Sequence, residues 1–215
     1  MNNPVLASLL TDPTLNTAPD DCSAAHFAQE LIHARQTVLP KRLVDPGPSA
    51  EQLHQICLAA SAAPDHGKLI PWRFVLIPAS ARHRLAKVFE EALLSRDPHA
   101  TAEQVAQAAE KAYRAPTLIL AIAKTTAGDP GIDSYERMVS VGCAIQNMLL
   151  TATALGFGSA LTSGKALRSS QLSALFSLAT GEVAVCFLSI GTVSSRKPIR
   201  IRTGVHEYLT TLADG

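Results

Sequence analysis

The feature that most constrains this sequence is a stretch without any charged residue between Arg137 and Lys165. Apolar residues recur in it at steps of three and four, which is the spacing of one helix face. They are Met138, Val141, Ile145, Leu149, Ala152 and Leu155. The opposite face carries only small or neutral polar side chains, so water has little to solvate there. We therefore expect a helix that is buried on nearly all sides and ends at the glycine-containing turn 156–159.

A membrane-spanning helix is the alternative interpretation of this stretch, because its length would suffice. Gln146, Asn147 and several threonines lie inside it, however, and such polar residues argue against a span. The sequence therefore favours a core helix, and a second copy of the chain is a candidate for covering its outer face.

The composition describes one apolar domain. Of 215 residues, 47% are hydrophobic and 17% are charged, and the net charge is +1. A chain of this length buries a sizeable core, and its near-neutral charge argues against wrapping nucleic acid or an anionic membrane. So low a charged fraction suggests that a partner, often an identical one, covers much of the surface. We expect residues 1–22 to form a flexible or partner-draped arm and residues 23–215 to form the domain.

The four cysteines, Cys22, Cys57, Cys143 and Cys186, lie far apart and form no Cys-x-x-Cys pair. Three of them stand in apolar runs, where a thiol is usually a small core residue. No N-terminal segment combines a basic start with an apolar run, so no export signal is visible. These features predict a cytoplasmic protein.

Helical and strand patterns follow one another in mixed order along the chain. Helices are expected at 24–35, from Ser49, after Ser80, from Thr101, across 138–155 and at 170–176. Strands are expected at 73–77, 117–123 and 183–190. Few strands among many helices predict an α/β or α+β sandwich built on one sheet.

Local signals add detail to two parts of this pattern. In the first helix, Phe27, Leu31 and Ile32 have the spacing of a face turned inward. Ser49 and Thr101 each precede a glutamine by three residues, which is the spacing of a capping box.

Three consecutive residues, Arg35, Gln36 and Thr37, stand where the first helix gives way to a loop. A guanidinium, an amide and a hydroxyl can together surround a phosphate, with bidentate bonds from the arginine. Other basic residues follow closely or come after the last strand: Lys41, Arg42, Arg196 and Lys197. The alternative is that each is a solvated surface charge, but their place at the ends of elements favours an anion site.

His66 lies in the turn 63–67, where a histidine is more often structural or exposed than functional. No second histidine or carboxylate stands at metal-ligand spacing, so we expect no metal site. Gly156-x-Gly158 follows a helix instead of a strand and is therefore no dinucleotide-binding fingerprint. The chain also lacks a Gly-x-Ser-x-Gly elbow and a phosphate-binding loop, which argues against hydrolase and nucleotide-triphosphate chemistry.

Four short motifs stand in a fixed order: Arg35-Gln36-Thr37; Ala63-Pro64-Asp65-His66 with Pro71-Trp72-Arg73-Phe74; residues 156–164; and Ile190-Gly191-Thr192 with Arg196. In this order, they resemble four features of the FMN-dependent nitroreductases. These are the N-terminal Arg-x-Ser/Thr signature, the segment that approaches the flavin ring, the turn after the central helix, and the last strand with its phosphate-contacting base. The resemblance is to the short, single-domain branch of that family and covers about residues 24–212. Each motif is weak alone, but four in this order are fairly specific.

The resemblance implies an α/β (α+β) nitroreductase-like sandwich, in which helices flank one central mixed sheet and the long buried helix lies at a dimer interface. It also implies a homodimer with two FMN molecules at the subunit interface. The cofactor-binding residues that it implies are Arg35, Gln36, Thr37, Lys41, Ala62, His66, Leu161, Thr162, Ser163 and Arg196. Of these, Arg35, Thr37 and Arg196 would contact the phosphate and the ribityl chain. The partner subunit's His66 and residues 161–163 would lie beside the ring.

The sequence departs from the commoner family pattern in two places. The usual basic residue two positions after the Ser/Thr is Leu39 here, and Lys41 or Arg42 would then supply the positive charge near flavin N1. Lys68-Leu69-Ile70 replaces the amide-bearing residues that usually precede Pro-Trp.

The implied activity is a ping-pong reaction in which NAD(P)H, as co-substrate, reduces bound FMN and a nitroaromatic, quinone or similar acceptor reoxidises it. The flavin supplies this chemistry, so no acid–base pair, nucleophile or other catalytic side chain is required of the protein. Two alternatives stay open: an FMN-binding or storage protein without efficient turnover, and a structural α/β dimer without a cofactor.

Overall fold

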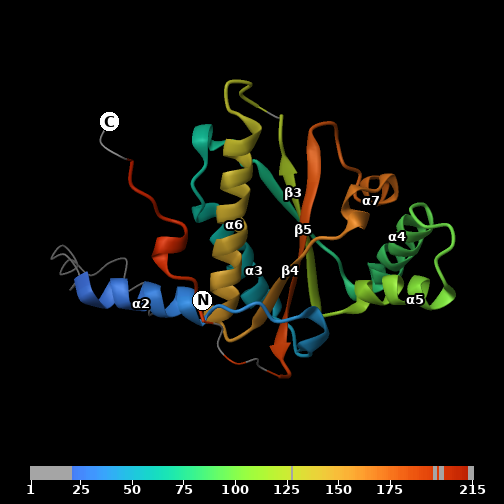
Figure 1. Ribbon diagram of the computed structural model, residues 1–215, viewed down its shortest axis with the longest axis horizontal. Helices are drawn as coiled ribbons and strands as arrows, with labels where there is room; N and C mark the ends of the chain where they lie inside the picture. Colours follow the sequence, from blue (N-terminus) through green and yellow to red (C-terminus); the bar gives the residue numbers. More distant parts are fainter. Residues whose placement is uncertain (1–20, 127, 196–197, 199–200, 213–215) are drawn as a thin grey trace.

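The computed structural model describes residues 21–126, 128–195, 198 and 201–212. One five-stranded sheet lies at their centre, with helices on both of its faces (Figure 1). The strands are β1 (Leu43–Val44), β2 (Trp72–Leu76), β3 (Thr117–Lys124), β4 (Gly158–Thr162) and β5 (Glu182–Val193). Their order is β1-β5-β3-β2, and β4 also pairs with β5. The predicted α+β sandwich on one sheet is confirmed.

The strands of this sheet pair antiparallel throughout. Parallel pairing occurs among the described residues only at one isolated bridge, between Thr37 and Ser159. The expected mixed sheet is wrong in this detail, because the five described strands form an antiparallel sheet and Thr37 of the parallel bridge belongs to none of them. β3 is buried along residues 117–123 because helices cover both faces, which explains its continuous apolar sequence.

One face of the sheet is covered by α6 (Ser134–Ala154) and α3 (Ala50–Leu58). The Asp133 side chain caps α6 by accepting a hydrogen bond from the Tyr135 backbone N–H at 2.6 Å. The inward stripe of α6 packs on the sheet, and its Val141, Ala144 and Met148 are fully buried. The predicted central helix is therefore present at the predicted place.

The outer face of α6 is open in the single chain. Tyr135 is 82% exposed and Val139 is 65% exposed. The chain by itself thus buries one face of this helix, whereas the sequence predicts burial on nearly all sides. No helix among the described residues has the length and apolarity needed to cross a membrane.

The other face of the sheet is covered by α4 (Arg82–Leu94), α5 (Ala102–Glu110) and α7 (Ser170–Leu175). Leu85 and Leu172 pack there against Leu120, and all three are fully buried. The rings of Phe89 and Phe187 meet edge to face, with centroids 5.8 Å apart.

The capping boxes predicted at Ser49 and Thr101 are both formed, with each hydroxyl accepting from the backbone N–H three residues on at 3.2 Å. Short 3-10 segments connect the larger elements: η2 (Pro40–Arg42), η3 (Ala59–Ala62), η4 (His66–Lys68), η5 (Ala79–Ala81), η6 (Lys111–Tyr113), η7 (Lys165–Arg168) and η8 (Val205–Glu207). Buried Arg137 ties a connection to α6 by donating from Nε to the Ile132 carbonyl at 3.0 Å.

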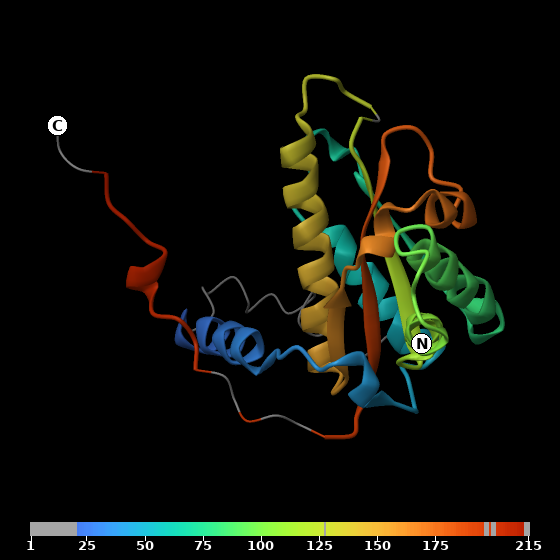
Figure 2. The same cartoon turned by 45° about the vertical axis from the view of Figure 1, so that its right-hand side comes forward.

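The first described helix, α2 (Asp21–Ala34), lies to one side of the sandwich, and so does the described part of the C-terminal tail (Figure 2). The predicted inward face of this helix is wrong for the single chain, since Phe27 is 64% and Ile32 is 50% exposed. The predicted boundary between residues 22 and 23 falls inside α2. The rest of the predicted arm, residues 1–20, lies outside the described residues.

Candidate functional site

The extended segment 35–39 runs beside β4 and brings its polar residues to the sheet edge. Val38 donates its backbone N–H to the Ser159 carbonyl at 2.9 Å. Gly158 permits close packing here, because an added Cβ would lie 2.5 Å from Val193 Cγ2, 2.9 Å from Leu43 Cδ2 and 3.1 Å from Val38 Cγ2. The glycine turn that the sequence singled out therefore serves close packing at this edge.

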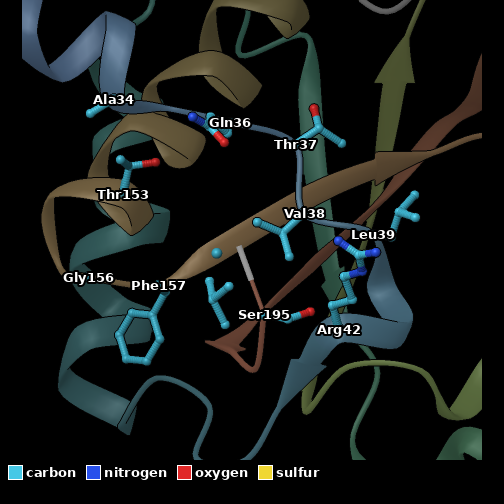
Figure 3. A pocket seen from close by; sticks show the side chains of 12 residues that line it. Ala34, Gln36, Thr37, Val38, Leu39, Arg42, Thr153, Gly156, Phe157 and Ser195 are labelled. Atoms are coloured by element: carbon cyan, nitrogen blue, oxygen red, sulfur yellow. The ribbon is translucent and has the colours of Figure 1, made fainter. Parts of the chain in front are cut away.

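A small cavity of about 160 Å³ lies between this segment and the C-terminal end of α6 (Figure 3). Its polar lining comes from Gln36, Thr37, Arg42, Thr153 and Ser195. No carboxylate is among the described residues that line it. The lining therefore offers hydrogen-bond donors and one positive charge, which suits an anionic or polyhydroxyl group.

Arg35 lies next to a second arginine from the C-terminal tail. Nη2 of Arg202 donates to the Arg35 carbonyl oxygen at 3.0 Å. Burial lowers the pKa of the Arg35 guanidinium below its ordinary value, and the nearby positive charge of Arg202 lowers it further. Neither arginine has an acidic partner among the described residues. Two like charges without a carboxylate between them are an arrangement that a bound anion stabilises.

A large cavity of about 640 Å³ lies on the α4 and α5 side of the sheet. Thr162 and Ser163, both predicted ring neighbours, line it. Leu39 lines both cavities, so the two meet at this residue. The predicted phosphate contact Thr37 and its neighbour Gln36 therefore line the small cavity, and two predicted ring residues line the adjoining large one, whereas Arg35 lines neither.

Several other predicted residues do not line these two cavities in one chain. Lys41 is exposed and lines neither cavity, whereas Arg42 lines the small one. Leu161 is 43% exposed and also lines neither cavity. Arg196 lies outside the described residues.

His66 lies near the other end of α6. His66 Nδ1 is 2.8 Å from Glu136 Oε2, at the N-terminal end of that helix. Glu136 is about 25 Å along the helix axis from Thr153 in the small cavity, at 1.5 Å per residue. In a single chain His66 therefore does not share a site with Gln36 and Thr37. Ala62 ends η3, which packs against α6, and it lines neither cavity.

The loop that carries His66 has a strained backbone. Gly67, Lys68 and Ile70 have φ angles of 70°, 53° and 46°. The Asp65 carboxylate holds this shape by accepting from the Ile70 backbone N–H at 2.8 Å. A β-branched residue at positive φ is rare, and such strain is concentrated at functional loops.

Sequence reasoning missed several features in and beside these cavities. The hydroxyl of Ser159, between the two cavity-lining segments, is buried without a hydrogen-bond partner. Arg202 was only one base among several in the tail, and no local pattern pairs it with Arg35. The cations of the large cavity come from separate elements, which periodicity cannot bring together.

Other chemistry finds little support in the described residues. Burial raises the pKa of the Cys186 thiol to about 11 and also raises the pKa of Cys57, so neither is a ready thiolate near neutral pH. No group of three or more metal-ligating side chains occurs in the part of the chain that the structure describes.

Comparison with solved structures shows which class of protein has this fold. A nitroreductase-like family protein from Bacillus cereus superimposes with a TM-score of 0.72 at 20% identity, over 86% of this chain and 95% of that chain. A Desulfovibrio desulfuricans protein described as a "putative nitroreductase in complex with fmn" superimposes with a TM-score of 0.65 at 21% identity, over 87% of this chain and 97% of that chain. The fold is that of the nitroreductase-like proteins.

Comparison of sequences is more specific. The family model described as "Nitroreductase family" matches residues 32–192. The "Putative NAD(P)H nitroreductase" of Haemophilus influenzae is 34% identical over 152 residues, which are 71% of this chain and 82% of the relative. The "Putative NAD(P)H nitroreductase YdjA" of Escherichia coli K12 is 32% identical over 165 residues, which are 77% of this chain and 87% of the relative. This chain belongs to the nitroreductase family, so the predicted family and its oxidoreductase class are confirmed.

Proposed function

We propose that this protein is an FMN-dependent NAD(P)H oxidoreductase that works by a ping-pong reaction and reduces a nitroaromatic, quinone or similar acceptor. The observation that carries the proposal is the pair Arg35 and Arg202, two cations without a carboxylate partner beside the polar segment 35–37. Membership of a family of named NAD(P)H nitroreductases, with a structural relative described in complex with FMN, supports the identity of the ligand.

The residues present fit FMN by their chemistry. A phosphate dianion needs cations and N–H or O–H donors. Gln36 and Thr37 supply such donors to the small cavity, and the cations Arg35 and Arg202 lie together beside this segment without lining the cavity. The small cavity alone holds less than a molecule of this size requires, since sites for such ligands span roughly 300–1,000 Å³. The large cavity, which adjoins the small one at Leu39, would supply the additional room.

When bound, FMN accepts a hydride from NAD(P)H at N5 and passes two electrons to the acceptor. The protein's own residues bind and orient the cofactor. Of the two candidates for the positive charge near flavin N1, the geometry favours Arg42, because its side chain lines the small cavity beside Leu39 (Figure 3) and that of Lys41 does not. A cation there stabilises the negative charge of the reduced ring.

A homodimer belongs to the same proposal. The outer face of α6 exposes uncharged side chains, among them Tyr135 and Val139, and α2 exposes Phe27 and Ile32. Exposed apolar surface of this kind marks interaction sites. In such a dimer His66 would serve the partner's flavin, since it lies too far from the small cavity of its own chain.

The experiment that tests the proposal is anaerobic titration of the purified protein with NADPH or NADH. We expect a yellow protein whose flavin absorbance bleaches on addition of reductant and returns on addition of a nitroaromatic or quinone. Bound FMN that neither nucleotide reduces would favour the storage alternative. A colourless protein that takes up no FMN on incubation would favour a structural dimer without cofactor.

A cytoplasmic location completes the proposal. The three cysteines that the structure describes, Cys57, Cys143 and Cys186, are all free thiols, as a reducing compartment favours.

A further inference from the structure

The large cavity has an apolar floor. Leu118 of β3 and Phe187 of β5 form part of it, and both are buried. Phe89 and Leu93 of α4 also line the cavity, and the ring of Phe89 packs edge to face against that of Phe187. Together these side chains give the cavity the hydrophobic lining that a flat organic ring prefers.

The rim of the same cavity is positively charged. Arg96 follows α4, Lys111 begins η6 and Lys165 begins η7, so three separate elements each contribute one cation. None of the three has a side-chain partner among the described residues, and no carboxylate lines the cavity there.

A fourth cation on the rim is already neutralised. Nη2 of Arg114 donates to Glu110 Oε2 at 2.5 Å, and its Nε donates to the same oxygen at 2.8 Å. The Glu110 carboxylate thus neutralises the charge of Arg114. No carboxylate among the described lining residues neutralises Arg96, Lys111 or Lys165. Three uncompensated cations at the rim of an apolar cavity favour a ligand with an apolar body and an acidic group.

The large cavity also opens beside the proposed flavin site. Leu39 separates it from the small cavity, and the predicted ring neighbours Thr162 and Ser163 form one of its sides. A ligand on the apolar floor would therefore lie close to where the flavin ring is proposed.

We propose that the large cavity selects the electron acceptor by its charge: it binds aromatic acceptors that carry a carboxylate, with the ring on the apolar floor and the carboxylate at Arg96, Lys111 and Lys165. The protein then prefers acidic aromatic acceptors over neutral ones of the same shape. This inference rests on the proposed oxidoreductase function, because only then is the bound ligand an electron acceptor. The binding itself does not require turnover.

The test compares two ligands that differ by one charge, 4-nitrobenzoate and 4-nitrobenzamide. Their dissociation constants are measured by calorimetry on FMN-loaded and on FMN-free protein, without NAD(P)H, so that no reduction occurs. We expect the benzoate to bind at least about tenfold more tightly than the amide, since a hydrogen bond to a charged group contributes more than a neutral one. The difference should shrink as salt is raised, because the cations are solvent-accessible.

The double variant Arg96→Gln/Lys111→Gln should lose most of this preference. Benzoate binding should weaken by about tenfold, while amide binding stays within about twofold. The matched control is Arg84→Gln/Lys87→Gln, which removes the same two charge types from exposed positions of α4 outside the cavity. The control should bind both ligands as the parent protein does.

Several results would overturn the inference. Equal affinity for both ligands, equal weakening of both in the double variant, or an equal effect of the control would each show that the rim does not recognise the carboxylate. Weaker binding of NADP+ with unchanged benzoate binding would assign the rim to the nucleotide phosphates instead. Failure to bind FMN together with a retained benzoate preference would contradict the proposed function and leave the cavity's selectivity standing.

Discussion

At the scale of single residues, the pair Arg35 and Arg202 is the arrangement that most needs an explanation. Like charges repel, and burial of Arg35 makes the repulsion stronger because less water screens it. A bound ligand of opposite charge would stabilise this arrangement. A phosphate between the two guanidiniums would remove the repulsion and gain charge-assisted hydrogen bonds.

We therefore predict that Arg35→Gln and Arg202→Gln each weaken FMN binding by about 1.5–3 kcal/mol, the range for a hydrogen bond to a charged group. Riboflavin lacks the phosphate, so its binding should change much less. Quenching of flavin fluorescence gives both dissociation constants. Equal weakening of FMN and riboflavin would show that these arginines support the fold instead of the phosphate.

A second residue-level prediction concerns the ion pair between Arg73 and Glu182. Nε and Nη2 of Arg73 donate to the two carboxylate oxygens, each at 2.7 Å. The hydrogen bonds from Arg73 are the main reason why the pKa of Glu182 falls from 4.5 to about 2. Because the folded-state pKa is depressed, this stabilisation is fully present above about pH 4.5 and is lost as the pH falls towards 2.

Glu182→Gln should accordingly lower the free energy of unfolding by about 1–2 kcal/mol at pH 7, a value reduced for the partial exposure of Arg73. The difference from the parent protein should narrow between pH 4.5 and pH 2. Urea unfolding at several pH values measures it. A difference that is constant with pH would mean that the side chain matters for packing and that its charge does not.

At the scale of elements, the approach of segment 35–39 to β4 positions the small cavity. Gly158 lies beside this segment, and an added Cβ would meet Val193, Leu43 and Val38 at 2.5, 2.9 and 3.1 Å. A Cβ there must displace these side chains, and a shift of Val38 would carry Gln36 and Thr37 with it.

Gly158→Ala should therefore destabilise the protein by about 1–3 kcal/mol, as overpacking does, and should weaken FMN binding as well. Thermal unfolding and flavin titration of this variant and of the parent protein give the comparison. An undisturbed Gly158→Ala protein would show that the segment adjusts without losing the cavity.

What the sequence could predict at this scale depended on how local the signal was. The capping boxes at Ser49 and Thr101 and the central helix need only neighbours within a turn or two, and each is present where predicted. The inward face of α2 failed because burial there requires a surface that a single chain does not provide. The proximity of Arg35 to Arg202, and of Arg96 to Lys165 across the large cavity, arises from tertiary folding, which residue spacing does not report.

At the scale of the whole molecule, one chain leaves an uncharged helix face uncovered. Tyr135 and Val139 on α6 are exposed, and the described tail exposes Ile201 and Leu212, each at 94%. Burying such residues against a second copy would remove apolar area from water. We expect the purified protein to be a dimer, as measured by size-exclusion chromatography with light scattering.

Val139→Glu should break this dimer, because it places an unpaired carboxylate in the interface and raises the dimer dissociation constant by at least about tenfold. FMN should be lost together with the dimer if the site needs both chains. Leu94→Glu, an exposed apolar residue of α4, is the matched control and should leave a flavin-loaded dimer. A monomeric Val139→Glu protein that keeps its flavin would contradict the shared site.

The separation of Arg35 from His66 by the length of α6 has a genetic consequence. In a dimer with sites shared between chains, one subunit impaired only at residue 35 and another impaired only at residue 66 would combine both defects in one site and leave the second site intact. Two inactive alleles would then complement each other when expressed together. Mixed dimers purified through two different affinity tags should regain about half of the parent's flavin occupancy and turnover, whereas neither allele alone would regain any.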